Sequence, residues 1–248
     1  MKILAVNGSP RRERSNTARL LGPMLEGARE GGADIEQLYL ADLDVRPCTG
    51  CFSCWTRTPG RCVQEDDGPE LLAKMRAADA LVLGFPLYIF GPPAGVQAML
   101  ERLLPTVEPW LVESDGSTGH PVREGAGVGP WTVLSNCGFP EQGHFDALRL
   151  KLAHLGIEPV CMAAGEFLPA MEREEELAQP LAALRSALRE AGEELAHEGS
   201  LSQSTRERLD RPVIEWAGVT ADEYRQQGNE SFRRALEAAR RRQGGEYK

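Results

Sequence analysis

Four cysteines lie close together in the chain, at a spacing that suits metal or redox chemistry. Cys48, Cys51 and Cys54 are separated by two residues each, and Cys62 follows after seven more. Two intervening residues allow a turn to direct neighbouring sulfurs toward one point, so these thiolates can hold an iron–sulfur cluster. A tetrahedral zinc site more often has two separated pairs of ligands. A third interpretation is a cysteine-rich turn that binds no metal.

A second group of polar residues follows the first apolar segment. Residues 2–6 are typical of a buried strand, and residues 20–28 carry apolar side chains at helical spacing. Between them lie hydroxyl, amide and guanidinium groups that suit a phosphate monoester. These are Ser9, Arg11, Ser15, Asn16 and Thr17. With the free N–H groups of a helix start, they favour a phosphate site over a capped turn, which needs only one of them.

Strand-like and helical patterns alternate along the first two thirds of the chain. Further strand-like runs cover residues 35–40, 80–84, 131–135 and 158–162, with helical patterns between them. This alternation predicts an α/β fold with a parallel sheet. The first loop contains neither the Walker A pattern nor the glycine pattern of dinucleotide folds.

Three loops of the chain resemble those of a known family. Gly8-Ser9-Pro10-Arg11, followed by Ser15-Asn16-Thr17, resembles the flavin-phosphate loop of the NADPH-dependent FMN reductase family, within the flavodoxin-like fold. Residues 86–89 and 136–138 resemble that family's second and third flavin loops. The resemblance covers about the first 165 residues and implies a doubly wound, five-stranded parallel sheet in the order 2-1-3-4-5. In that order the loops after strands 1, 3 and 4 lie side by side, where ligands bind.

The resemblance implies noncovalent FMN and a set of residues that bind it. These are Ser9, Arg11, Ser15, Asn16, Thr17, Pro86, Leu87, Tyr88, Ile89, Asn136, Cys137 and Gly138. Because FMN carries the electron chemistry, no side chain is expected to act as a catalytic acid or base. NADH or NADPH would deliver hydride. The electrons would pass to a quinone, another flavin, or another small-molecule or protein acceptor.

The cysteine spacing also resembles the compact motif of the iron–sulfur flavoproteins, a related branch. This implies a cluster on Cys48, Cys51, Cys54 and Cys62 and a role as an electron-transfer partner. FMN reductase relatives also carry similar cysteines without an established metal, so the metal-free turn stays an alternative. A further functional hypothesis is a noncatalytic, flavin-bound module that senses redox state.

The overall composition excludes some partners. With 28 basic and 37 acidic residues, the net charge of −9 argues against a broad nucleic-acid interface. The uncharged residues 80–96 are interrupted by prolines and glycines, so no membrane helix is expected. No signal pattern precedes the first strand, and we therefore expect a cytoplasmic protein with reduced cysteines.

The remaining residues predict a helical extension. Residues 1–165 suffice for a flavodoxin-like domain, and residues 166–248 carry apolar stripes at helical spacing. We expect these helices to pack on the core or on a second subunit, in a homodimer or higher homo-oligomer. Residues 105–129 have no apolar period and predict a long surface loop. Phe90 is assigned no functional role, and His144 is placed at the surface.

Overall fold

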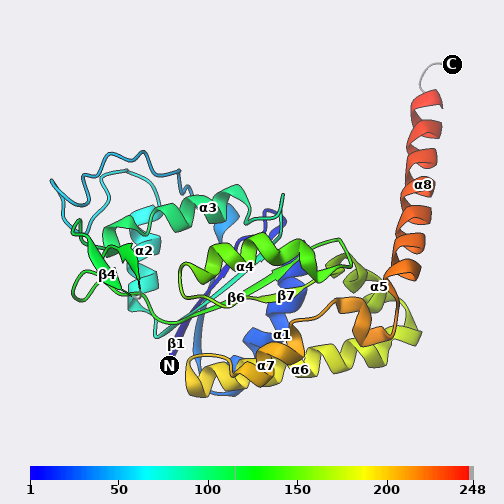
Figure 1. Ribbon diagram of the computed structural model, residues 1–248. Helices are drawn as coiled ribbons and strands as arrows, with labels where there is room; N and C mark the ends of the chain where they lie inside the picture. The colour runs from blue at the N-terminus through cyan, green and yellow to red at the C-terminus, as the bar shows by residue number, and fades with distance from the viewer. Residues whose placement is uncertain (115, 246–248) are drawn as a thin grey trace.

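A five-stranded parallel sheet forms the centre of the computed structural model, which describes residues 1–114 and 116–245 (Figure 1). Its strands are β1 (Lys2–Asn7), β2 (Asp34–Tyr39), β3 (Ala80–Pro86), β6 (Trp131–Asn136) and β7 (Val160–Met162). Their order is β2-β1-β3-β6-β7, and every neighbouring pair is parallel. The predicted α/β class and the order 2-1-3-4-5 are therefore confirmed.

Helices cover both faces of this sheet. The helices of the described residues are α1 (Asn16–Glu30), α2 (Gly68–Ala77), α3 (Ala94–Glu101), α4 (Asp146–Ala153), α5 (Leu168–Arg173), α6 (Ala178–Glu198), α7 (Gln203–Leu209) and α8 (Ala221–Gly245), of which α8 projects away from the sheet (Figure 1). Alternate residues of β1 point to opposite faces: Ile3 packs in a cluster with α1, α5 and α6, and Leu4 in a cluster with α2, α3 and α4. No helix in the described ranges has the length and apolar character needed to cross a membrane.

The helical extension is part of the core through α6. A Cβ atom on Gly192 of α6 would lie 1.9 Å from the Met24 carbonyl oxygen of α1, and one on Gly27 would lie 2.0 Å from the Arg189 carbonyl oxygen. These glycines let the two helix backbones touch, so any side chain at either position would push the helices apart. The division of the chain into a flavodoxin-like domain of residues 1–165 and a helical extension of residues 166–248 stays a prediction.

The segment expected to be one long loop contains a small hairpin. Strands β4 (Val112–Ser114) and β5 (Ser117–Gly119) pair in antiparallel fashion, and an isolated bridge joins Val107 to Val122. The prediction of an irregular loop over residues 105–129 is corrected here. These strands are short and exposed, so they lack the apolar alternation by which a sequence indicates a strand.

A buried ion pair fixes the segment before α2. The two terminal guanidinium nitrogens of Arg102, Nη1 and Nη2, donate to the Asp66 carboxylate at 2.6 and 2.8 Å. Both side chains are almost completely buried. The Arg46 and Gly68 backbone N–H groups donate to the same carboxylate. The sequence predicts Asp66 and Asp67 only as an acidic helix cap. Asp67 makes no side-chain cap bond, and Asp66 mainly neutralises Arg102.

Candidate functional site

Three loops meet where β1, β3 and β6 end, as their adjacency in the sheet requires. The Gly8 N–H donates to the Gly84 carbonyl oxygen at 2.7 Å, and the Leu87 N–H donates to the Asn136 carbonyl oxygen at 2.7 Å. The Asn136 side-chain amide also donates to the Thr17 hydroxyl at 2.9 Å. The structure thus brings together the three loops that the sequence assigns to a flavin.

The first loop is closed around buried polar side chains. Ser9, Ser15, Asn16 and Thr17 are buried, whereas Arg11 is exposed at the rim. The Ser15 hydroxyl accepts a hydrogen bond from the N–H of residue 18 at 3.0 Å and therefore caps α1. It also donates to the carbonyl oxygen of residue 12 at 2.6 Å. Ser15 therefore has a structural task beside any contact with a ligand.

This loop fits a group that carries acceptor oxygens. The Asn7 amide nitrogen is buried beside the loop and has no hydrogen-bond partner among the described residues. The loop leads into the N-terminus of α1, whose dipole and free N–H groups attract an anion. The backbone is also tightly packed, because a Cβ atom on Gly8 would lie 2.2 Å from Val96 Cγ2. The Asn7 amide and the free N–H groups at the start of α1 are hydrogen-bond donors that suit a phosphate.

The second loop contains a tight turn with an unusual backbone. Tyr88 and Gly91 exchange backbone hydrogen bonds of 2.8 and 3.1 Å, and the residues between them, Ile89 and Phe90, have φ angles of +47° and +60°. Side chains rarely adopt this region, and a β-branched residue does so at a cost of about 1–3 kcal/mol. Ile89 is 94% exposed, so burial of its side chain does not explain the strain.

Aromatic rings from the second and third loops gather beside this turn. The His144 ring stacks on Phe139 with centroids 4.4 Å apart and on Phe90 with centroids 5.9 Å apart. Phe90 and Phe139 are both more than half exposed. We call these three residues the aromatic rim. The sequence patterns did not predict this rim, although an aromatic residue after each of two adjacent strands was the available signal.

The helical extension holds the third loop in place. The Tyr224 hydroxyl, from the first turn of α8, donates to the Gly138 carbonyl oxygen at 2.7 Å, and the Arg225 guanidinium pairs with Glu141. Burial raises the pKa of Tyr224 to about 12, so the phenol keeps the proton that it donates. Burial also raises the pKa of the Cys137 thiol in this loop. Local sequence patterns gave no sign of the Tyr224 contact.

The four clustered cysteines line one small cavity together with Arg102. Cys54 is buried, Cys51 is exposed, and Cys48 and Cys62 are half-buried. Hydrogen bonds from Ser53 and Thr49 lower the pKa of the Cys51 thiol to about 7. Burial, followed by the neighbouring thiols, raises the pKa of Cys54. The four sulfurs that line the cavity therefore differ in their exposure to solvent.

The donor set of this cavity suits a metal cluster, but the sulfurs are not assembled around one point. In residues 1–114 and 116–245, no three His, Cys, Asp or Glu side chains are grouped so as to hold a metal ion. The cysteine segment packs at the C-terminal end of α3, where the Cys48 N–H donates to Glu101 at 3.3 Å. The second flavin loop precedes the other end of α3. Eight helical residues, about 12 Å, separate the two regions.

Comparison with known proteins gives matches in sequence and in fold. The NADPH-dependent FMN reductase family matches residues 1–112. An iron–sulfur flavoprotein of Methanocaldococcus jannaschii is 38% identical over 105 residues, which cover 42% of this chain and 53% of that protein. An iron–sulfur flavoprotein of Archaeoglobus fulgidus is 30% identical over 168 residues, which cover 66% of this chain and 68% of that protein.

Among solved structures, an NAD(P)H:quinone oxidoreductase from Methanothermobacter marburgensis has a TM-score of 0.57 and 17% sequence identity. The match covers 80% of this chain and 97% of that one. At 17% sequence identity, the similarity to this structure shows a shared fold alone. The sequence match spans about half the length of the Methanocaldococcus relative and about two thirds of the Archaeoglobus relative.

Proposed function

Because the chain belongs to the NADPH-dependent FMN reductase family, we propose that it is an FMN-dependent NAD(P)H oxidoreductase that reduces a quinone, a flavin or another small acceptor. The observation that carries this proposal is the junction of three loops at the carboxyl edge of the sheet, where Asn136 bonds to both Thr17 and Leu87. Ligands of open α/β sheets bind at this edge.

Each loop has its own task in this proposal. The buried hydroxyls of Ser9, Ser15 and Thr17, with Arg11 at the rim, hold the phosphate of FMN at the start of α1. Residues 86–89 and 136–138 contact the flavin ring through the backbone and through Tyr88. The aromatic rim orients a planar acceptor by stacking. When bound, FMN supplies the electron transfer between nicotinamide and acceptor.

The experiment has two readouts, FMN affinity and turnover. We expect the purified chain to bind FMN rather than FAD, and to oxidise NADH or NADPH over many turnovers only when FMN and an acceptor such as a quinone are both present. Comparing the two nicotinamides gives the preferred donor. Binding of FMN without any turnover would instead favour the noncatalytic redox-sensing module. Failure to bind FMN would refute both functions.

A second candidate function is electron transfer through an iron–sulfur cluster on Cys48, Cys51, Cys54 and Cys62. The supporting observation is that these four thiols line one cavity, in a chain whose relatives include proteins named iron–sulfur flavoproteins. The test is iron and acid-labile sulfide analysis of anaerobically prepared protein and of Cys51→Ser. About four irons per chain that disappear in the variant would support a four-iron cluster. Protein free of iron, with unchanged NADPH oxidation in Cys51→Ser, would favour the metal-free turn.

We also propose that the protein is a homodimer or higher homo-oligomer. The support is the amount of helical surface that the extension adds beyond the sheet, above all on α8, of which every residue from 229 to 241 is exposed. The cytoplasmic location stays a prediction.

A further inference from the structure

Helix α8 projects from the body of the molecule as an arm (Figure 1). Tyr224 and Arg225 fasten its first turn to the third loop, but residues 229–241 are exposed on all sides. Phe232 and Leu236, four residues apart and thus on one face, are 73% and 58% exposed. Most helices in proteins are stabilised by packing rather than by their own propensity. The arm therefore needs a surface to cover its apolar face.

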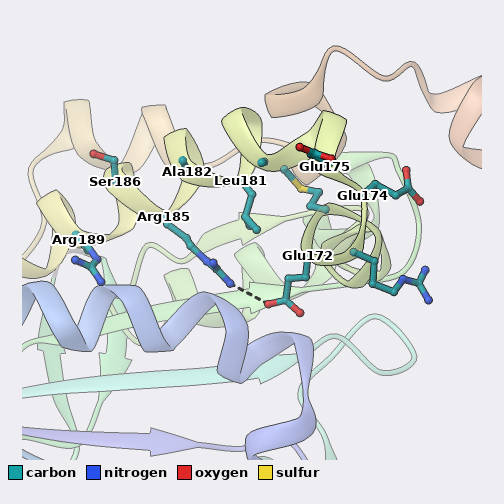
Figure 2. Close-up of a pocket in the computed structure, with 11 residues that line it drawn as sticks. Glu172, Glu174, Glu175, Leu181, Ala182, Arg185, Ser186 and Arg189 are labelled. Atoms are coloured by element: carbon teal, nitrogen blue, oxygen red, sulfur yellow. Dashed lines mark hydrogen bonds and ion pairs between the residues drawn. The ribbon is translucent and has the colours of Figure 1, made fainter.

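A groove with an apolar lining lies near the base of this arm. It has a volume of about 610 Å³ and lies between α5 and the first half of α6 (Figure 2). Met171, Leu181 and Ala182 give it an apolar lining, and Glu174 and Glu175 lie on its rim. Phe167, which directly precedes α5, packs against Tyr224 at the base of the arm.

The net charges of the arm and of the groove rim are opposite. Two arginines of the groove are already neutralised, Arg185 by Glu172 at 3.0 Å and Arg189 by Glu26. No ion pair of the described residues involves Glu174 or Glu175, so with Arg173 nearby the rim has an excess of negative charge. Residues 229–241 of the arm contain four arginines and two glutamates, and Arg234 pairs with Glu230 at 3.7 Å. The arm thus keeps an excess of positive charge. A basic apolar arm therefore matches an acidic apolar groove.

We propose that the arm of a second copy of this chain fills the groove, and that the exchange is reciprocal. An arm cannot enter its own groove, because it leads away from the body that carries the groove (Figure 1). When two arms lie antiparallel, the end of each reaches the base of the other, where the partner's groove lies. Phe232 and Leu236 then enter the apolar lining. Arg233 and Arg240, which lie beside Leu236 on the helix surface, meet Glu174 and Glu175. The contact is closed and isologous, as in most homodimers.

The test is a charge-swap cycle measured by analytical ultracentrifugation of the full chain. The arm variant is Arg233→Glu/Arg240→Glu, the groove variant is Glu174→Arg/Glu175→Arg, and the third variant carries all four changes. We expect each double variant to raise the dimer dissociation constant by about tenfold or more, because attraction becomes repulsion. The four changes together should restore most of the affinity. Arg29→Glu, an exposed charge reversal on α1, is the control and should leave the dimer unchanged.

Three outcomes would overturn the inference. The full chain could sediment as a monomer at micromolar concentrations, or the arm variant could dimerise as tightly as the parent chain. A monomeric chain that cosediments with phosphatidylglycerol vesicles would instead assign the basic arm to a membrane surface. FMN affinity is measured on the same variants, which leave Tyr224 and the three loops intact. Failure of the dimer and failure of the proposed function are therefore distinguishable.

Discussion

The Asn136 side-chain amide donates a 2.9 Å hydrogen bond to the Thr17 hydroxyl, across 119 residues of sequence. Both side chains are buried, so the bond ties the end of β6 to the first turn of α1 away from competing water. It fixes the third loop relative to the phosphate loop before any cofactor binds. Such preorganisation lowers the entropic cost of binding a ligand between the two loops.

Thr17→Val is predicted to weaken FMN binding by about tenfold to a hundredfold, because a lost hydrogen bond to a charged group is worth roughly 1.5–3 kcal/mol. The variant keeps the shape of the side chain but leaves the Asn136 amide without its acceptor. Quenching of FMN fluorescence measures the affinity. The matched control is Thr132→Val, because the Thr132 hydroxyl is buried, has no hydrogen-bond partner among the residues that the structure describes, and should be dispensable. Equal affinities in the two variants would contradict the phosphate assignment.

Tyr224→Phe is predicted to loosen the third loop. The lost bond to Gly138 should lower the free energy of unfolding by about 1 kcal/mol and speed amide hydrogen exchange over residues 136–141. Because the folded pKa is raised to about 12, this tyrosine stabilises the fold fully below pH 10 and progressively less as the pH rises toward 12. Tyr39→Phe, on edge strand β2, is the control. Unchanged exchange in the third loop would show that α8 does not hold it.

Ile89→Asn/Phe90→Gly is predicted to stabilise the protein by about 1–3 kcal/mol, because Asn-Gly suits a turn with two positive φ angles. The same variant removes one ring of the aromatic rim, so the KM for a quinone should rise while the KM for NADPH stays unchanged. Denaturant unfolding and steady-state kinetics give both values. Ile89→Asn alone keeps Phe90 and separates relief of strain from loss of the ring. An unaltered KM for quinone in the double variant would show that the aromatic rim is not part of the acceptor site.

Asp66→Asn is predicted to destabilise the fold by about 3 kcal/mol at neutral pH, since Arg102 would stay buried without its counter-charge. Hydrogen bonds from Arg102 hold the pKa of Asp66 at about 2. The carboxylate thus stabilises the folded state above about pH 4, and this contribution of about 2 kcal/mol disappears as the pH falls toward 2. Urea unfolding at several pH values tests this, with Glu70→Gln as the exposed control. If the free energy of unfolding of the parent chain fell with pH in the same way as that of Asp66→Asn, the stabilising role of the Asp66 carboxylate would be refuted.

The sequence predicts the sheet and the place of the site because both depend on local patterns. Apolar runs such as residues 80–84 indicate buried strands, and the polar residues after them must lie at the carboxyl edge of a parallel sheet. Strand order follows from the resemblance of the three loops. The bounds of the strands differ slightly, and the last strand begins at Val160 instead of residue 158.

The parts that the sequence does not predict depend on contacts between distant residues. Tyr224 reaches Gly138 across 86 residues, and Asp66 reaches Arg102 across 36. Neither pairing leaves a periodic signal, because each needs the folded helices to set the distance. The close contact of Gly192 with α1 is hidden for the same reason, since a glycine within a helical pattern reads only as a weak helix former.

The most direct test of the proposed function is an anaerobic titration of the FMN-loaded protein with NADPH, followed by absorbance. We predict that the visible flavin band bleaches in proportion to added NADPH, to an end point of one NADPH per flavin, and returns when a quinone is added. Thr17→Val should reach the same end point only at higher FMN concentration. A flavin band that remains bound but does not bleach with either nicotinamide would contradict the assignment as an oxidoreductase.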